Sequence, residues 1–129
     1  MITPDAITAL ILEDEPILGF ALEDMLLDMG VKGVTLATTI VEAHAYLDGG
    51  TPDLAVLDVN IHGHRSYTVA DRLVAAGIPF VFASGYGDAE HPEHLRDIPT
   101  MTKPYSDADL RQFVLAALGQ ADKAVDTGR

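Results

Sequence analysis

The sequence contains no cysteine and few basic residues, and each shortage excludes a class of protein. Without cysteine the chain can form neither a disulfide framework nor a thiolate metal site. Lysine and arginine total 8 against 20 aspartates and glutamates, which gives a formal net charge of -12. Because nucleic acids and anionic membrane surfaces bind to clustered cations, we expect neither as a direct partner.

Long hydrophobic runs are also missing. No stretch approaches the roughly 18 consecutive apolar residues of a membrane-spanning helix. The N-terminus does not show a basic region followed by a long apolar segment, so no signal peptide is expected. We therefore expect a cytoplasmic protein that does not enter a membrane.

Short apolar segments with strand character alternate with segments of helical periodicity. The expected strands are 7–12, 34–37, 54–57, 79–83 and 100–102. Each leads into a helical segment, of which the fourth is expected to be short or irregular because Pro92 interrupts it. This alternation predicts an α/β fold, in which helices cover both faces of a parallel sheet. We expect one domain over residues 1–119 and a disordered tail over residues 120–129.

Polar side chains follow four of the expected strands. Glu13 and Asp14 come after the first strand, Asp58 after the third, Ser84 after the fourth and Lys103 after the fifth. Because the carboxyl ends of parallel strands share one edge of the sheet, these residues should converge there. Carboxylates with oxygen partners suit a hard cation such as Mg²⁺. A lysine reaching that edge would pair with Asp58 and keep it ionised.

These groups are the ones that phosphoryl transfer onto an aspartate requires. Asp58 would be the nucleophile, a cation would bridge the phosphoryl oxygens, and Ser84 and Lys103 would neutralise developing charge. Each residue taken alone has an ordinary structural explanation, such as a turn or a surface salt bridge. Their joint position at strand ends favours a single site.

The set Glu13-Asp14, Asp58, Ser84 and Lys103-Pro104 resembles the CheY-like receiver domain of two-component response regulators. The resemblance extends from about residue 5 to residue 119. It implies a flavodoxin-like (βα)5 fold, a doubly wound parallel sheet with the strand order 2-1-3-4-5. It also implies that the peptide bond between Lys103 and Pro104 is cis.

The resemblance further implies a metal site and a phosphoryl donor. Mg²⁺ would be bound by Asp14, Asp58 and the backbone carbonyl of Asn60, with Glu13 assisting through water. Asp58 would accept its phosphoryl group from a phosphohistidine on a sensor histidine kinase or a histidine phosphotransfer protein. The catalytic activity of such a protein is limited to phosphotransfer onto its own aspartate and slow dephosphorylation.

A narrower likeness concerns the expected conformational switch. Residues 79–87 resemble the FATGUY signature of a subgroup of mostly stand-alone bacterial receivers, with Ser84 where the signature usually has threonine. Most receivers carry tyrosine or phenylalanine three residues before the lysine, but this chain has Thr100 there. We therefore expect Tyr86, close to Ser84, to replace the missing aromatic residue in the switch.

The expected function is that of a single-domain response regulator. Phosphorylation of Asp58 would draw Ser84 toward the phosphoryl group and reshape residues 86–100, changing the affinity for an unidentified downstream protein. We expect a monomer or a weak dimer. Two alternatives with the same domain remain open: a phosphate sink in a branched phosphorelay, and a docking module that does not depend on phosphate.

Proteins of other classes fit the sequence less well. A haloacid dehalogenase-type phosphatase needs an aspartate two residues after its nucleophile, where this chain has Asn60. An FMN-binding module needs hydroxyl and glycine donors after the first strand, where Glu13-Asp14-Glu15 would repel a phosphate. Nothing in the sequence unites the histidines into a transition-metal site. Of these, His62 and His64 lie in an expected loop beside Asp58, and His91 and His94 lie in the irregular segment after Tyr86.

Overall fold

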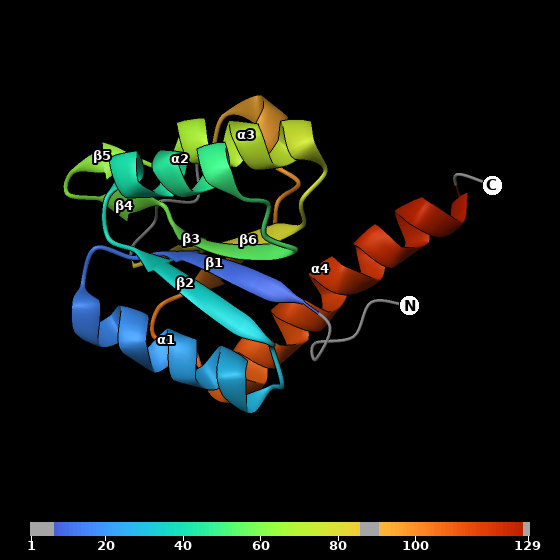
Figure 1. Cartoon of the computed structure of the whole chain (residues 1–129), viewed down its shortest axis with the longest axis horizontal. Helices are drawn as coiled ribbons and strands as arrows, with labels where there is room; N and C mark the ends of the chain where they lie inside the picture. Colours follow the sequence, from blue (N-terminus) through green and yellow to red (C-terminus); the bar gives the residue numbers. More distant parts are fainter. Residues whose placement is uncertain (1–6, 86–90, 128–129) are drawn as a thin grey trace.

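A computed structural model of the chain describes residues 7–85 and 91–127, with side chains up to residue 119. The core of the molecule is a five-stranded parallel sheet in the order β2-β1-β3-β6-β7 (Figure 1). Its strands are β1 (Thr8–Leu12), β2 (Gly33–Ala37), β3 (Leu54–Asp58), β6 (Phe80–Ser84) and β7 (Thr100–Thr102). Counted along the chain within this sheet, the order is 2-1-3-4-5, so the predicted flavodoxin-like fold is confirmed.

Helices cover both faces of the sheet (Figure 1). They are α1 (Pro16–Asp28), α2 (Ile40–Gly49), α3 (Tyr67–Ala76) and α4 (Asp107–Thr127). Helices α1 and α4 pack on one face, and α2 and α3 pack on the other. Between β6 and β7 the described residues form only the short 3-10 helix η2 (Glu93–Leu95), in agreement with the irregular segment expected around Pro92.

The central strands are hydrophobic because they are buried on both faces. Every residue of β3 and β6 is buried. Alternating side chains enter two separate hydrophobic clusters, with Val56 facing α1 and α4 and Leu57 facing α2 and α3. Burying a side chain of this size contributes about 1.5–3 kcal/mol. The two clusters hold the strand ends level with one another, which positions the polar residues that follow them.

A small hairpin occupies the segment after β3 that we expected to be a loop. It consists of β4 (Asn60–Ile61) and β5 (His64–Arg65), which pair antiparallel. Its two turn residues, His62 and Gly63, have φ values of 50° and 82°. Two consecutive positive φ values are typical of the type I′ turns that close two-residue hairpins. The sequence prediction missed this hairpin because its turn is His-Gly rather than the more familiar Asn-Gly.

The C-terminal helix is longer than expected. The structure continues α4 to Thr127, where the sequence predicted a disordered tail from residue 120, and this end extends beyond the sheet (Figure 1). The sequence predicts that the helix ends at Gly119, but a glycine inside a helix lowers the helix stability by only about 1 kcal/mol relative to alanine. No proline follows it, and Ala121 and Ala124 have high helix propensity. Within the described ranges, no helix is both long and apolar enough to cross a membrane.

Helix α2 begins with a capping box that can be tested directly. The Thr39 hydroxyl accepts a hydrogen bond from the Glu42 N–H at 3.0 Å, and the Glu42 carboxylate accepts one from the Thr39 N–H at 3.2 Å. We expect Thr39→Ala to lower the free energy of unfolding by about 1 kcal/mol. Thr39→Ser keeps the hydroxyl and should retain most of that stability in urea unfolding followed by circular dichroism. Equal losses in the two variants would argue against the cap.

Candidate functional site

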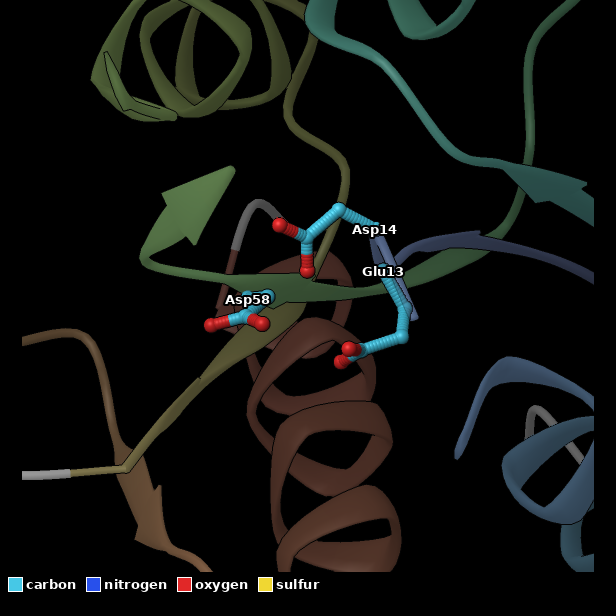
Figure 2. A group of neighbouring side chains, drawn as sticks. All are labelled: Glu13, Asp14 and Asp58. Carbon is cyan, nitrogen blue, oxygen red and sulfur yellow. The ribbon is translucent and has the colours of Figure 1, made fainter. Parts of the chain in front are cut away.

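Three carboxylates meet at the carboxyl ends of β1 and β3 (Figure 2). Glu13 and Asp14 directly follow β1, and Asp58 is the last residue of β3. The register pairs Leu12 with Leu57, so the two strands end at the same level. One oxygen from each carboxylate lies within 4.8 Å of the others. Glu13 and Asp58 are buried and Asp14 is half-buried, so their mutual repulsion is poorly screened by water.

Lys103 reaches this cluster from the far edge of the sheet. Its Nζ donates to Glu13 Oε2 at 2.8 Å and to Asp58 Oδ2 at 2.9 Å. Its backbone N–H donates to the carbonyl of Ser84 at 2.7 Å, which ties the end of β7 to the end of β6. The bond from Lys103 to Pro104 is cis, the isomer that the resemblance implied. Sequence reasoning anticipated the contact with Asp58 but not the one with Glu13.

Burial and charge pull the ionisable groups of the site in different directions. Burial raises the pKa of Glu13, and the hydrogen bond from Lys103 only partly opposes this effect. Burial would lower the pKa of Lys103, but the hydrogen bonds to Glu13 and Asp58 outweigh it and raise that pKa above its usual value. The lysine therefore remains a cation throughout the physiological pH range.

The β4–β5 hairpin contributes backbone donors to two of the carboxylates. The N–H of His62, at the turn, donates to Asp14 Oδ2 at 2.9 Å. The N–H of Asn60 donates to Asp58 Oδ1 at 3.3 Å. The second oxygen of Asp58 is bound by Lys103, so this carboxylate is held from both sides. The hairpin thus orients Asp14 and Asp58 at the mouth of the site.

Ser66 is a site residue that sequence reasoning missed. It precedes α3, where a serine is usually interpreted as a helix cap, but its side chain forms no cap hydrogen bond. Instead its hydroxyl, fully buried, donates to the backbone carbonyl of Asp58 at 2.7 Å. It holds the backbone of Asp58 in place. No pattern in the sequence distinguishes this role from an ordinary N-cap.

The expected switch residues lie in different surroundings. Ser84 is buried at the end of β6, next to the strand that carries Asp58. Thr100 opens β7, and its hydroxyl lies 2.7 Å from Nε2 of His91. Tyr86 lies outside the described residues. Among the described residues, the group that could hold a metal ion contains three carboxylates and no histidine, so His91 is not part of it.

The donor set of the cluster fits a hard divalent cation. All three side chains offer carboxylate oxygens, which Mg²⁺ prefers over nitrogen or sulfur ligands. Three carboxylates face a single ammonium group, so two negative charges remain in excess when all three carboxylates are ionised. Asp14 is half-buried, and Lys103 binds the other two carboxylates. The acidic cluster therefore matches a magnesium site in both ligand chemistry and charge.

Comparison with known proteins identifies the class. No protein-family model and no curated protein matches the chain. Among solved structures, the CheY-like receiver domain protein from Methanospirillum hungatei JF-1 superposes with a TM-score of 0.80. It is 19% identical and the match covers 92% of this chain and 98% of that one. At this identity the likeness establishes the fold, which is that of a response regulator receiver domain.

More similar sequences share that fold. SdrG from Sphingomonas melonis Fr1 is 40% identical, with a TM-score of 0.71 over 87% of this chain and 95% of that one. The BeF3-activated conformation of SdrG from Pseudomonas melonis Fr1 is 38% identical, with a TM-score of 0.72 over 92% and 98% of the two chains. This chain therefore belongs to the response regulator receiver family.

The lysine bridge predicts a specific pH dependence of stability. In Lys103→Met, measured without Mg²⁺, Glu13 and Asp58 would face each other with no cation between them. The pKa of Glu13, already raised by burial, would rise further, so the folded state would bind a proton that the unfolded state releases. We expect the variant to be about 2 kcal/mol less stable than the parent near pH 7. This deficit should shrink as the pH falls toward about 5.

Urea unfolding at several pH values measures this difference. Lys32→Met removes an exposed lysine and serves as the control, with an expected stability close to that of the parent. A deficit in Lys103→Met that is constant between about pH 5 and pH 8 would show that the carboxylates do not depend on this cation.

Proposed function

We propose that this protein is a response regulator that accepts a phosphoryl group on Asp58. The observation that supports this most is the setting of Asp58, a buried carboxylate at the end of β3. It lies 2.9 Å from the Lys103 ammonium and within the reach of two further carboxylates. A nucleophilic carboxylate requires fixed orientation and nearby positive charge, and both are present.

The proposed reaction transfers a phosphoryl group from a histidine of another protein to Asp58. An oxygen of Asp58 attacks the phosphorus of a phosphohistidine on a sensor histidine kinase or a histidine phosphotransfer protein. The P–N bond breaks, its electron pair stays on the imidazole, and an aspartyl phosphate forms on Asp58. Lys103 and the hydroxyl of Ser84 then bind the phosphoryl oxygens that acquire charge. Water later attacks the same phosphorus, which restores the carboxylate and releases phosphate.

A Mg²⁺ ion held by Asp14, Asp58 and the Asn60 carbonyl, with Glu13 assisting through water, would neutralise the phosphoryl oxygens by Lewis-acid interaction. The chain prepares for this charge with its own groups. The hairpin N–H groups orient Asp14 and Asp58, and Lys103 binds Glu13. Asp14 is the member of the cluster that is partly exposed to solvent.

Phosphorylation then alters a surface that binds a downstream protein. Ser84 moves toward the phosphoryl group, and the described residues 91–100 change their shape and their affinity for a downstream protein. Beryllofluoride mimics an aspartyl phosphate, and a BeF3-activated conformation exists for the 38% identical SdrG. That relative supports the use of beryllofluoride as a phosphate mimic for this chain.

Intact mass spectrometry tests the phosphoacceptor. After incubation with phosphoramidate and Mg²⁺, the parent should gain the mass of one phosphoryl group and Asp58→Asn should gain none. Asp24→Asn, which neutralises an exposed acid on α1, should be phosphorylated like the parent. Chelation of Mg²⁺ should prevent the adduct. A parent that neither forms the adduct nor responds to beryllofluoride would refute the proposed function.

The metal ligands are tested by a Mg²⁺ titration followed through amide chemical shifts. Asp14→Asn removes one ligand charge but keeps the size of the side chain, so the dissociation constant for Mg²⁺ should rise at least about tenfold. Asp24→Asn again provides the control, with an affinity close to that of the parent. Equal affinities in all three proteins would remove Asp14 from the proposed ligand set.

A further inference from the structure

A buried histidine outside the acidic cluster links two parts of the fold. The imidazole of His91 is 6% exposed and lies between two hydroxyl groups. Its Nδ1 is 3.0 Å from the hydroxyl of Tyr67, at the start of α3. Its Nε2 is 2.7 Å from the hydroxyl of Thr100, at the start of β7. Nothing in the chemistry proposed for Asp58 uses this residue.

Aromatic packing fixes the ring in this position. The imidazole of His91 packs on Phe82 of β6, with ring centroids 4.5 Å apart and planes tilted by 35°. Tyr67 approaches both rings edge-on, at 5.9 Å from Phe82 and 5.7 Å from His91. Phe82 is also the register partner of Thr100. The histidine thus contacts α3, β6 and β7 at once.

Both ring nitrogens of His91 lie within hydrogen-bond distance of a hydroxyl group. The hydroxyl of Thr100 also donates to the carbonyl of Ile98, at 3.5 Å. With a hydrogen on Nε2, the imidazole can therefore donate to the oxygen of Thr100 while Nδ1 accepts from the hydroxyl of Tyr67. The ring thus joins the start of α3 to the start of β7.

Both ends of this network lead to the phosphoacceptor. Tyr67 follows Ser66, whose hydroxyl donates to the backbone carbonyl of Asp58 at 2.7 Å. Thr100 opens β7, which leads to Lys103, and Lys103 contacts Asp58. On the other side His91 leads into η2, which lies beside α3 (Figure 1) and is bonded to it through His94 and Asp71 at 2.7 Å.

We propose that His91 is a positioning residue that transmits phosphorylation of Asp58 to the exposed segment 92–98. The inference rests on the proposed function and specifies how its signal leaves the site. Ser84 lies two residues beyond Phe82 on β6, so a movement of Ser84 toward the phosphoryl group displaces the ring on which His91 packs. Because the imidazole is bonded to α3 and to β7, it moves together with them and carries η2 with it.

The test compares amide chemical shifts before and after adding beryllofluoride and Mg²⁺ to the full chain. In the parent, residues around Asp58 and residues 92–98 should both respond. His91→Phe keeps a ring on Phe82 but removes both hydrogen bonds. Amide signals around Asp58 should still shift in this variant, with an affinity for beryllofluoride within about threefold of the parent's. The chemical-shift changes of residues 92–98 should fall by at least half.

Two further variants separate transmission from a general loss of packing. His91→Gln can still accept from Tyr67 and donate to Thr100, so it should recover most of the response of residues 92–98. Asp24→Asn, which changes an exposed residue of α1 outside this network, should respond like the parent both around Asp58 and at residues 92–98. If His91→Phe fails to fold, Thr100→Val takes its place as the test variant, because it removes one hydroxyl of the network.

The outcomes distinguish this inference from the function on which it rests. A parent that does not respond to beryllofluoride around Asp58 refutes the proposed function and, with it, the role of His91. If the parent and His91→Phe respond equally around Asp58 and at residues 92–98, the proposed role of His91 is wrong and the proposed function is unaffected. The ¹⁵N shifts of the imidazole in the parent provide a check without mutation: they should change when beryllofluoride is added, and unchanged shifts would also overturn the inference.

Discussion

The geometry of the site depends on one electrostatic constraint: three carboxylates share an edge of the sheet with a single ammonium group. The ammonium of Lys103 lies between Glu13 and Asp58, with both contacts under 3 Å. To reach them, Lys103 must follow a strand at the edge of the sheet and extend across the end of β6. The negative charge left over makes the cluster attractive to a divalent cation, so the same repulsion that opposes folding favours binding.

Most of the fold could be predicted because it depends on local pattern. Apolar runs mark the buried strands, and their alternation with helical segments predicts a parallel sheet covered on both faces. Two elements were missed for identifiable reasons. The turn of the β4–β5 hairpin places histidine, rather than the more typical asparagine, at positive φ. The extension of α4 follows from helix propensity that outweighs one interior glycine.

The site could be predicted only as far as strand ends determine it. Glu13, Asp14, Asp58 and Lys103 each follow a strand, and the structure brings them to one edge. The roles of other residues depend on which way a side chain turns, and sequence spacing does not determine this. The hydroxyl of Ser66 turns toward β3 instead of capping its helix, and His91 turns inward from a connecting segment.

The side chain at the turn of the β4–β5 hairpin can vary without loss of the main-chain contact to Asp14. The hairpin holds Asp14 through the main-chain N–H of His62 at 2.9 Å, and the imidazole Nδ1 of the same residue lies 3.8 Å from that carboxylate. Any residue that accepts a positive φ can supply the N–H, and asparagine or glycine does so readily. The side chain at this turn can therefore be exchanged for recognition of different molecules while the main-chain hydrogen bond to Asp14 is kept. Specificity and chemistry are carried by separate atoms of the same short turn.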